Sequence, residues 1–245
     1  MREVRLNIKS EENMMLQRIC IMIVLVVIIL TSTVFAAIPA KMNIENANER
    51  SQETLLIHSV EGTAYNLFLI SDNAKYNSRY LSEKSGIYVG DYYVYLARVG
   101  DDTAVLQTGI RPFPTLDRTG NTPNGCYVIS SQTGMPDILE NLFRATGGGG
   151  YAATFYAIKD NRLKEIKFMD KDKRITSGYK AIDLYREKDA ARYLDDGTFY
   201  LHTWANAWPN AGTYKTVYMF DTKNLIMIRA YGYKKGVHDD DYHEI

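Results

Sequence analysis

The chain has 245 residues, of which 46% are hydrophobic and 12% aromatic, and its 29 Lys and Arg balance its 29 Asp and Glu. Four of the basic and three of the acidic residues precede residue 41, so the remainder carries 25 positive against 26 negative side chains. This balance excludes the strongly basic surface typical of nucleic-acid-binding domains, so we expect no nucleic-acid partner.

The first predicted element is an export segment. Residues 19–30 (ICIMIVLVVIIL) are uninterrupted apolar residues behind a basic n-region at residues 1–18, and the charge-free segment extends to residue 37. Cleavage after Ala36 would make residues 19–37 the core of a signal peptide, whereas an uncleaved segment would form a single membrane anchor. With either outcome we expect the C-terminal part outside the cytoplasm, either secreted or periplasmic, or anchored to the membrane by one span.

Beyond the export segment, the sequence predicts a linker at residues 41–53, one β-rich extracytoplasmic domain at residues 54–233 and a polar acidic tail at residues 234–245. Cys126 is the one cysteine in this part of the chain, so it has no partner for an intramolecular disulfide. We therefore expect packing alone to hold the domain together, with Cys126 as a buried thiol.

Four strand-turn-strand patterns follow one another along the domain. Each has two runs of β-branched, aromatic and other apolar residues joined by a short turn rich in Gly, Asp or Asn, which tolerate the positive φ of tight hairpins. The patterns lie at residues 54–71, 91–108, 151–168 and 216–233. They predict a mainly β fold built as a meander of antiparallel hairpins.

The spacing of three tyrosines predicts an internal repeat. Tyr95, Tyr156 and Tyr218 fall at comparable places in the first strands of three hairpins, 61 and 62 residues apart. A repeat of about 61 residues is longer than a common propeller blade, so a propeller-like arrangement is kept as an alternative to an open meander.

One or two short helices are also expected. Residues 135–147 (MPDILENLFRATG) place apolar side chains on one helical face, with a proline near the start and a glycine past the end. Residues 180–194 have a helical composition without a clear apolar stripe, which fits an exposed helix or a strand followed by a loop.

The glycine run at residues 147–150 does not predict a phosphate site. A phosphate-binding loop stands between a strand and a helix, with a lysine next to a serine or threonine at its end. Here the expected order is a helix, the glycines and then a strand, and that lysine pair is absent. We expect the glycines to end the helix and lead the chain into the hairpin at residues 151–168.

A segment in the middle of the chain resembles part of a known enzyme family. The pattern TG…TPNG.Y.I within residues 108–130 is similar to a strand-loop-strand of the bacterial L,D-transpeptidases, exported enzymes that cross-link cell-wall peptides. Members of that family use a cysteine in a later SHGC segment with a histidine upstream. This chain has no such segment, so the family's activity is not carried over. Cys126 with His202 is the weak catalytic pair that remains.

Two other groups of side chains are candidate sites. The C-terminal stretch GVHDDDYHEI offers His238, Asp240 and His243 as weak metal candidates, but a polar chain end favours a solvated tail, so neither metal nor cofactor is expected. Both tryptophans occur in the segment HTWANAWPNAGTY, whose Asn, Pro and Gly residues predict a loop. Its candidate ligand-binding residues are Trp204, Asn206, Trp208 and Asn210, and packing of the two tryptophans over the core is the alternative.

The function predicted from these patterns is an exported, non-catalytic domain of the envelope or the medium that binds a cell-wall, glycan or protein partner. The first alternative is an envelope enzyme that uses Cys126 and His202. The second is a structural or assembly protein that pairs with its partner through sheet edges. The membrane is a partner only through residues 19–37, if that segment stays uncleaved.

Overall fold

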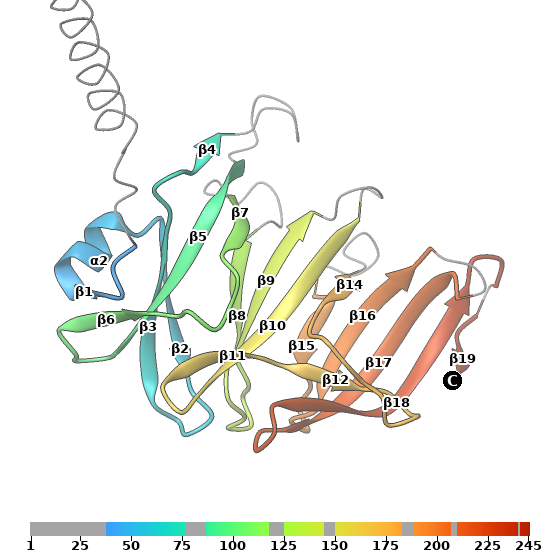
Figure 1. Cartoon of the computed structure of the whole chain (residues 1–245). Helices are drawn as coiled ribbons and strands as arrows, with labels where there is room; N and C mark the ends of the chain where they lie inside the picture. The colour runs from blue at the N-terminus through green and yellow to red at the C-terminus, as the bar shows by residue number, and fades with distance from the viewer. Residues whose placement is uncertain are drawn as a thin grey trace, which may run out of the picture. The chain divides into compact units, whose positions relative to one another are not determined.

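The computed structural model describes residues 38–76, 87–117, 125–144, 150–182, 189–206, 210–239 and 241–245. The predicted export segment at residues 19–37 and the basic region before it lie outside these residues. Within the described ranges, no helix is both long and apolar enough to cross a bilayer. Residues Ala40–Ile245 form one compact unit, and it is mainly β (Figure 1).

The first half of this unit forms a seven-stranded antiparallel sheet in the order β1-β6-β5-β3-β2, with β4 and β7 also paired to β5. One helix, α2 (Ile44–Arg50), is present among the described residues, and it lies in the stretch expected to be a linker. The strands are β1 (Lys41–Asn43), β2 (Glu53–His58), β3 (Ala64–Ile70), β4 (Lys75–Tyr76), β5 (Ile87–Arg98), β6 (Thr103–Leu106) and β7 (Phe113–Asp117).

The second half forms a twelve-stranded sheet in the order β13-β12-β18-β17-β16-β14-β10-β9-β8, with β11 paired to β10, β15 to β16 and β19 to β18. The pairing of β12 with β18 is parallel and the others are antiparallel. The strands are β8 (Gly125–Ile129), β9 (Ile138–Arg144), β10 (Tyr151–Lys159), β11 (Arg162–Glu165), β12 (Lys167–Met169), β13 (Ile175–Thr176), β14 (Lys180–Ile182), β15 (Ala191–Tyr193), β16 (Phe199–Ala205), β17 (Gly212–Asp221), β18 (Ile226–Gly236) and β19 (His243–Glu244).

The four predicted hairpins are confirmed. They correspond to the antiparallel pairs β2–β3, β5–β6, β10–β11 and β17–β18. The turn of the β10–β11 hairpin shows why these residues predict a hairpin. Asp160 and Asn161 both adopt positive φ, at 54° and 60°. Two consecutive positive φ values match the twist of a two-residue hairpin, and Asp and Asn tolerate them better than most residues.

The helix predicted at residues 135–147 is wrong, because Ile138–Arg144 forms strand β9. This strand is buried on both faces: Ile138 and Leu142 pack in one core cluster and Leu139 in another. A strand buried on both faces loses the alternation of apolar and polar residues, so its pattern imitates a helical face. Since β9 pairs with β10 across the glycine run, the run joins two strands of a hairpin.

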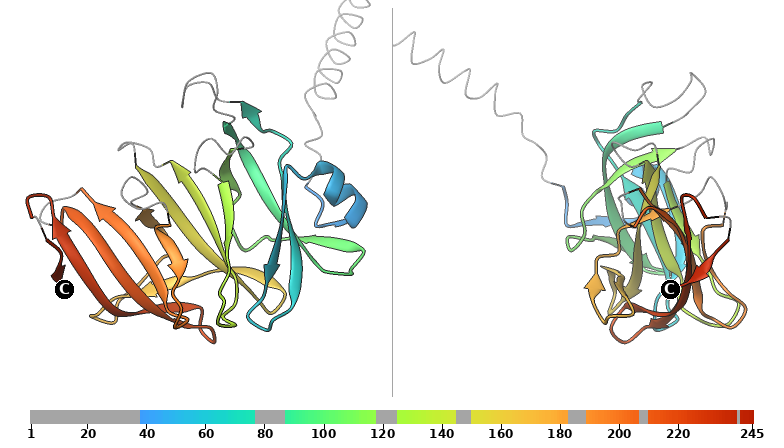
Figure 2. Two further views of the ribbon diagram at one scale, coloured as in Figure 1. Left: turned by 180° about the vertical axis from the view of Figure 1, so that it is seen from behind. Right: turned by 90° about the vertical axis from the view of Figure 1, so that its right-hand side faces the viewer.

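Three apolar clusters hold the unit together. One cluster, with Leu67, Tyr92 and Leu139, joins the seven-stranded sheet to β8–β11, and a second packs α2 against the other face of the seven-stranded sheet. The third fills the twelve-stranded sheet from β9 to β18 around Phe155 and Phe168. Strands β11 and β12 run across this third cluster from β10 to β18, out of the plane of β16–β18 (Figure 2).

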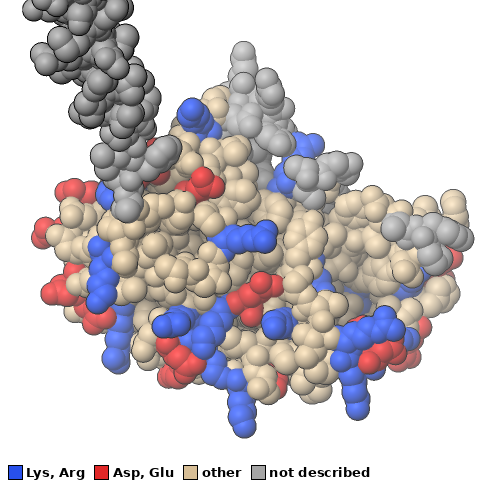
Figure 3. Space-filling model, in the orientation of Figure 1, with Lys and Arg blue, Asp and Glu red and all other residues tan. Residues whose placement is uncertain are grey.

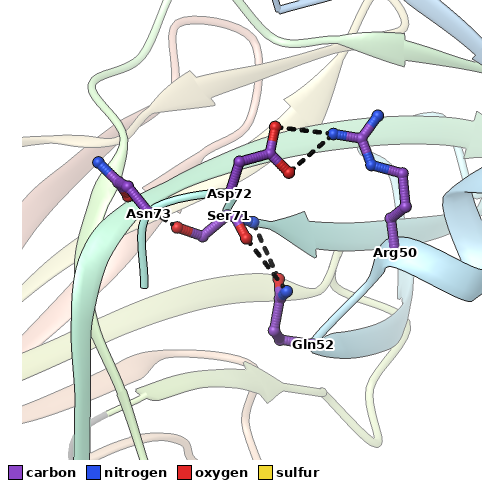
Figure 4. Close-up of polar contacts among 5 residues, drawn as sticks. All are labelled: Arg50, Gln52, Ser71, Asp72 and Asn73. Atoms are coloured by element: carbon purple, nitrogen blue, oxygen red, sulfur yellow. Dashed lines mark hydrogen bonds and ion pairs between the residues drawn. The ribbon is translucent and has the colours of Figure 1, made fainter. Parts of the chain in front are cut away.

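Polar side chains fix the end of α2 to the end of β3 (Figure 4). Arg50 places Nη2 2.8 Å from both carboxylate oxygens of Asp72. The Gln52 side chain accepts from the backbone N–H of Ser71 at 2.9 Å and donates to its carbonyl oxygen at 3.2 Å. These contacts add to the backbone bond from the Gln52 N–H to the Leu69 oxygen at 2.9 Å, and together they anchor the helix to the sheet.

The predicted repeat stays a prediction. Tyr95, Tyr156 and Tyr218 each stand three residues before the end of their strand, as expected, but they pack in three different clusters. The described strands belong to two large sheets rather than to several small ones of about four strands, so this order gives the propeller alternative no support.

Candidate functional site

A cavity of about 220 Å³ opens beside the third cluster, between the β12–β13 hairpin and strands β14 and β16–β18. Its lining combines an apolar floor with hydroxyl and charged groups from five strands and one chain end. The lining residues are Phe168, Met169, Asp170, Thr176, Lys180, Thr203, Tyr214, Thr216, Tyr218, Arg229 and Ile245. Convergent polar groups over an apolar floor are typical of a ligand site.

The β12–β13 hairpin forms one wall, and Asp170 shapes its turn. The Oδ1 atom of Asp170 accepts hydrogen bonds from the backbone N–H groups of Asp172 and Arg174, at 2.9 and 2.8 Å. Lys173 completes the turn with a φ of 62°. One oxygen of the Asp170 carboxylate therefore serves its own turn.

The segment after this hairpin approaches the body of the sheet because Gly178 carries no side chain. A Cβ atom at this position would lie 2.5 Å from the backbone oxygen of Ile166. The Gly178 N–H also donates to Oε1 of Glu165 at 2.6 Å. This close approach fixes the segment between Thr176 and Lys180, the two polar residues that it contributes to the cavity.

Lys180 places a cation in a largely apolar setting. Its Nζ lies 4.5 Å from the centroid of the Phe168 ring and donates to Oγ1 of Thr176 at 3.1 Å. Burial lowers the pKa of Lys180 from its ordinary value, and the negative charge of Asp170 opposes the shift. A cation–π contact and one hydroxyl only partly replace the water that a lysine loses on burial.

Strands β17 and β18 form the facing wall, with Tyr218 and Arg229 directly opposite in the register. Burial raises the pKa of Tyr218 to about 12, so its phenol stays neutral, and its ring meets Phe168 edge to face at 5.0 Å. Arg229 donates to a carboxylate oxygen of the C-terminal residue Ile245 at 2.6 Å and lies across Gly232, where a Cβ atom would be 2.9 Å from Nη2. The guanidinium is thus held against the strand.

Charges elsewhere on the surface are mixed. Basic and acidic side chains are interspersed along the lower edge of the unit in Figure 3, without one broad field of a single sign. The cavity lining is mixed as well, because it holds two cations, Lys180 and Arg229, and two carboxylates, those of Asp170 and of the C-terminal residue Ile245.

The structure does not bring Cys126 and His202 together. Three strands, β14, β10 and β9, separate β16 from β8, which corresponds to roughly 19 Å at the usual strand spacing. Cys126 is buried in the cluster between the sheets, and burial raises its pKa well above the ordinary value, with Glu53 and Glu140 adding to the shift. His202 is buried elsewhere, with Nε2 3.2 Å from the Tyr242 hydroxyl.

The aromatic segment is split by the limits of the described residues. Trp204 lies in β16 and is partly buried against Gly150, where a Cβ atom would be 2.4 Å from its ring. Asn206 and Asn210 are exposed. Trp208 lies outside the described residues, so its role as a ligand-binding residue stays a prediction.

The metal candidates at the C-terminus are partly ordered into the sheet. His243 belongs to β19, which pairs with β18, while His238 is exposed beyond the end of β18 and Asp240 lies outside the described residues. In the part of the chain that the structure describes, no group of three or more His, Cys, Asp or Glu side chains is placed to hold a metal ion.

The cavity residues were missed by sequence reasoning. Lys180, Arg229 and Tyr218 come from three separate strands and form no motif in the sequence. The one signal available was that a lysine and an arginine stand among apolar residues, in the stretches YKAI and IMIRAY. Such residues also occur on ordinary half-exposed strands, so this signal could not have identified a site.

Comparisons with known proteins give no match: no family model, no curated protein and no solved structure corresponds to this chain. The segment that resembles the L,D-transpeptidases contains β7 and β8, which pair with β5 and β9 and not with each other. The function is therefore argued from the cavity alone.

Proposed function

We propose that this chain is a non-catalytic binding domain that acts outside the cytoplasm and holds one unit of a cell-wall, glycan or protein partner. The observation that carries the proposal is the cavity between the β12–β13 hairpin and strands β14 and β16–β18, in which hydroxyl and charged groups converge over Phe168 and Met169. Its place outside the cytoplasm rests on the apolar, charge-free segment at residues 19–37.

The size of the cavity limits the ligand. A volume of about 220 Å³ lies below the roughly 300–1,000 Å³ of pockets that enclose drug-sized molecules. It suits a single sugar ring or one amino-acid side chain rather than a whole oligomer. A partner built of repeated units would therefore insert one unit, with its other units outside the cavity.

A binding role also fits the placement of the predicted catalytic pair. Nucleophilic catalysis by a thiol needs a base within hydrogen-bond reach, and Cys126 and His202 lie several strands apart. The raised pKa of Cys126 further disfavours the thiolate that such chemistry requires.

Binding is tested with the full chain and a panel of soluble cell-wall muropeptides, neutral sugars and acidic sugars, using ligand-detected nuclear magnetic resonance. We expect a subset of the panel to bind the wild type and to lose binding in Thr216→Phe, which fills the cavity. Val105→Phe, on an exposed position of β6, is the matched control and keeps binding. Circular dichroism checks the fold of each variant.

Two results would contradict the proposal. Binding that survives Thr216→Phe in a folded protein would place the ligand outside the cavity. Conversion of a bound panel member to a new product would favour the envelope-enzyme alternative. Export is tested separately by cell fractionation, where a full-length soluble chain in the cytosol would disprove it and a mature N-terminus at Ala37 would show cleavage.

A further inference from the structure

We infer that residues 241–245 occupy a peptide-binding groove, which takes an acidic, tyrosine-containing segment of a partner protein in their place. The groove includes the cavity, so the inference rests on the proposed function and names its partner as a protein chain in extended form. The structure shows one such segment in place. Strand β19 lies along the outer edge of β18, and Ile245, which follows it, lines the cavity (Figure 1).

Backbone pairing holds this segment to the sheet. Strand β19 (His243–Glu244) pairs antiparallel with Tyr233 and Lys234, and the N–H of Ile245 donates to the oxygen of Gly232 at 3.0 Å. Addition of a strand to a sheet edge is a common mode of peptide recognition, and its main-chain bonds do not depend on the side chains of the peptide. The edge of β18 can therefore hold an extended segment of another protein, and side-chain contacts decide which one.

Tyr242 is the side chain that anchors the segment. Its hydroxyl lies 3.2 Å from Nε2 of His202 and 3.2 Å from Oγ1 of Thr213, and both of these residues are buried. Nζ of Lys215 lies 4.6 Å from the centroid of its ring. A site built to hydrogen-bond a hydroxyl rejects an analogue that lacks it, because the polar groups of the site then lose this contact. These contacts therefore select tyrosine over phenylalanine at this position.

A β-bulge places the cavity at the end of the groove. The register between β17 and β18 shifts at Val217/Tyr218, where the pairing skips Ala230 of β18. A bulge changes the direction of the side chains beside it. The neighbouring residue, Arg229, lines the cavity and donates to a carboxylate oxygen of Ile245 at 2.6 Å. An aliphatic residue three positions after the tyrosine is therefore the second requirement on the partner segment.

Charge complementarity favours an acidic partner. Three lysines, Lys215, Lys234 and Lys235, belong to the two strands that form the groove. The segment HDDDYHEI, which ends in the groove, contains four acidic residues. Attraction between exposed charges speeds the approach of a matching partner and weakens in high salt. A partner segment with Asp or Glu on either side of its tyrosine is therefore favoured over a basic one.

The chain's own segment is held by few buried contacts. Of the described residues 241–245, Tyr242 is partly buried and the other four are exposed, as are residues 237–239 before them. A short strand with exposed backbone pairing opens locally at a low cost in free energy. An uncovered edge of β18 would pair with unrelated strands, so the segment protects this edge until a partner replaces it.

The experiment measures binding of a peptide with the sequence of residues 237–245, labelled at its N-terminus, to the full chain by fluorescence anisotropy. Tyr242→Ala releases the chain's own segment, so the peptide should bind this variant at least about tenfold more tightly than the wild type, whose groove is occupied. His243→Pro, which puts a residue without a backbone N–H into β19, should have the same effect. Tyr76→Ala, at an exposed position of β4, is the matched control and should bind like the wild type. Circular dichroism checks the fold of each variant.

Two further changes test where the peptide binds. A peptide with phenylalanine in place of its tyrosine should bind Tyr242→Ala about fivefold more weakly, because the contacts of the hydroxyl with His202 and Thr213 are lost. Lys215→Met, added to Tyr242→Ala, should weaken binding of the tyrosine peptide, since it removes the cation over the ring. Lys164→Met, which removes an exposed lysine in the β10–β11 turn region, should leave it unchanged.

The outcomes separate this inference from the proposed function. Equal peptide binding to the wild type and to both folded segment variants, or no binding to any of them, would overturn the groove inference. Panel binding that is lost in Thr216→Phe would still support the proposed function in that case, whereas failure of both the peptide and the panel would remove both. Peptide binding that neither Lys215→Met nor the phenylalanine peptide weakens would place the peptide elsewhere. A wild-type dimer that Tyr242→Ala converts to a monomer would assign the groove to a second copy of this chain and would also overturn the inference.

Discussion

Buried charge is handled in opposite ways in two regions of this protein. Near the junction of the two sheets, Glu53 and Glu140 are acids whose pKa values burial raises to about 7 and about 8. Oε2 of Glu53 is buried and has no hydrogen-bond partner among the residues that the structure describes. In the cavity, Lys180 and Arg229 face a space that a ligand can enter. Desolvation thus leaves the acids to neutralise themselves by holding a proton, whereas the cations have carboxylates of the same lining beside them, Asp170 near Lys180 and the C-terminal Ile245 at Arg229.

The largest expected effect is a loss of folding stability with rising pH, caused by the buried acids Glu140 and Glu53. An acid whose pKa is raised in the folded state holds its proton where the unfolded chain has released it, so stability falls as pH rises from about 4.5 to about 8. For Glu140 the predicted loss is on the order of 4 kcal/mol across this range. Glu53 adds less, because it is only partly buried.

The variant Glu140→Gln tests this expectation. A neutral amide of the same shape should remove most of the pH dependence, so the free energy of unfolding in urea should be similar at pH 5 and pH 8. Glu49→Gln, at an exposed position of α2, is the control and should leave the wild-type slope unchanged. A wild-type free energy of unfolding that stays level or rises over this range would contradict the comparison between the two regions.

A smaller effect is expected where backbone packing shapes the cavity. In Gly178→Ala the new Cβ would meet the backbone oxygen of Ile166 at 2.5 Å, and backbone cannot yield as a flexible side chain does. The expected cost is about 1–3 kcal/mol of stability, together with weaker ligand binding because the segment contains Thr176 and Lys180. Gly109→Ala is the control, since its Cβ would meet nothing within 4 Å. Equal thermal midpoints for both variants would show that the wall is not tightly fixed.

The local order of apolar residues and turn residues was enough to predict the hairpins. The same kind of reasoning gave the wrong element for β9, where burial on both faces removes the alternation of apolar and polar residues. Turns such as Asp160–Asn161 fix their strands through backbone preference, which the sequence shows directly. Strand β9 is covered on both faces by two clusters, so its spacing imitated a helix. The cavity was unpredictable for a different reason: Lys180 and Arg229 meet only through the order of β14, β16, β17 and β18, and that order depends on long-range pairing.

The predicted ligand-binding segment, residues 202–214, also shows that long-range contacts cannot be predicted from local sequence. Composition predicted a loop in residues 202–214, whereas residues 202–205 belong to β16 and residues 212–214 to β17. It also could not show that Trp204 would pack against the backbone of Gly150. That contact joins residues more than fifty positions apart and depends on a glycine at one of them. A tryptophan in a loop sequence is therefore weak evidence of an exposed ring.

The smallest expected effect comes from charges that are neither buried nor beside a cavity. The side chains of Arg50 and Asp72 are 40% and 72% exposed, so water competes for their ion pair (Figure 4). A double-mutant cycle with Arg50→Ala and Asp72→Ala should give a coupling of about 0.2–1 kcal/mol that declines in high salt. Gln52→Ala should cost more and be insensitive to salt, because it removes two hydrogen bonds to the backbone of Ser71. A coupling above about 2 kcal/mol would mean that exposure does not govern the strength of charged contacts here, and the contrast between buried acids and cavity cations would then need another cause.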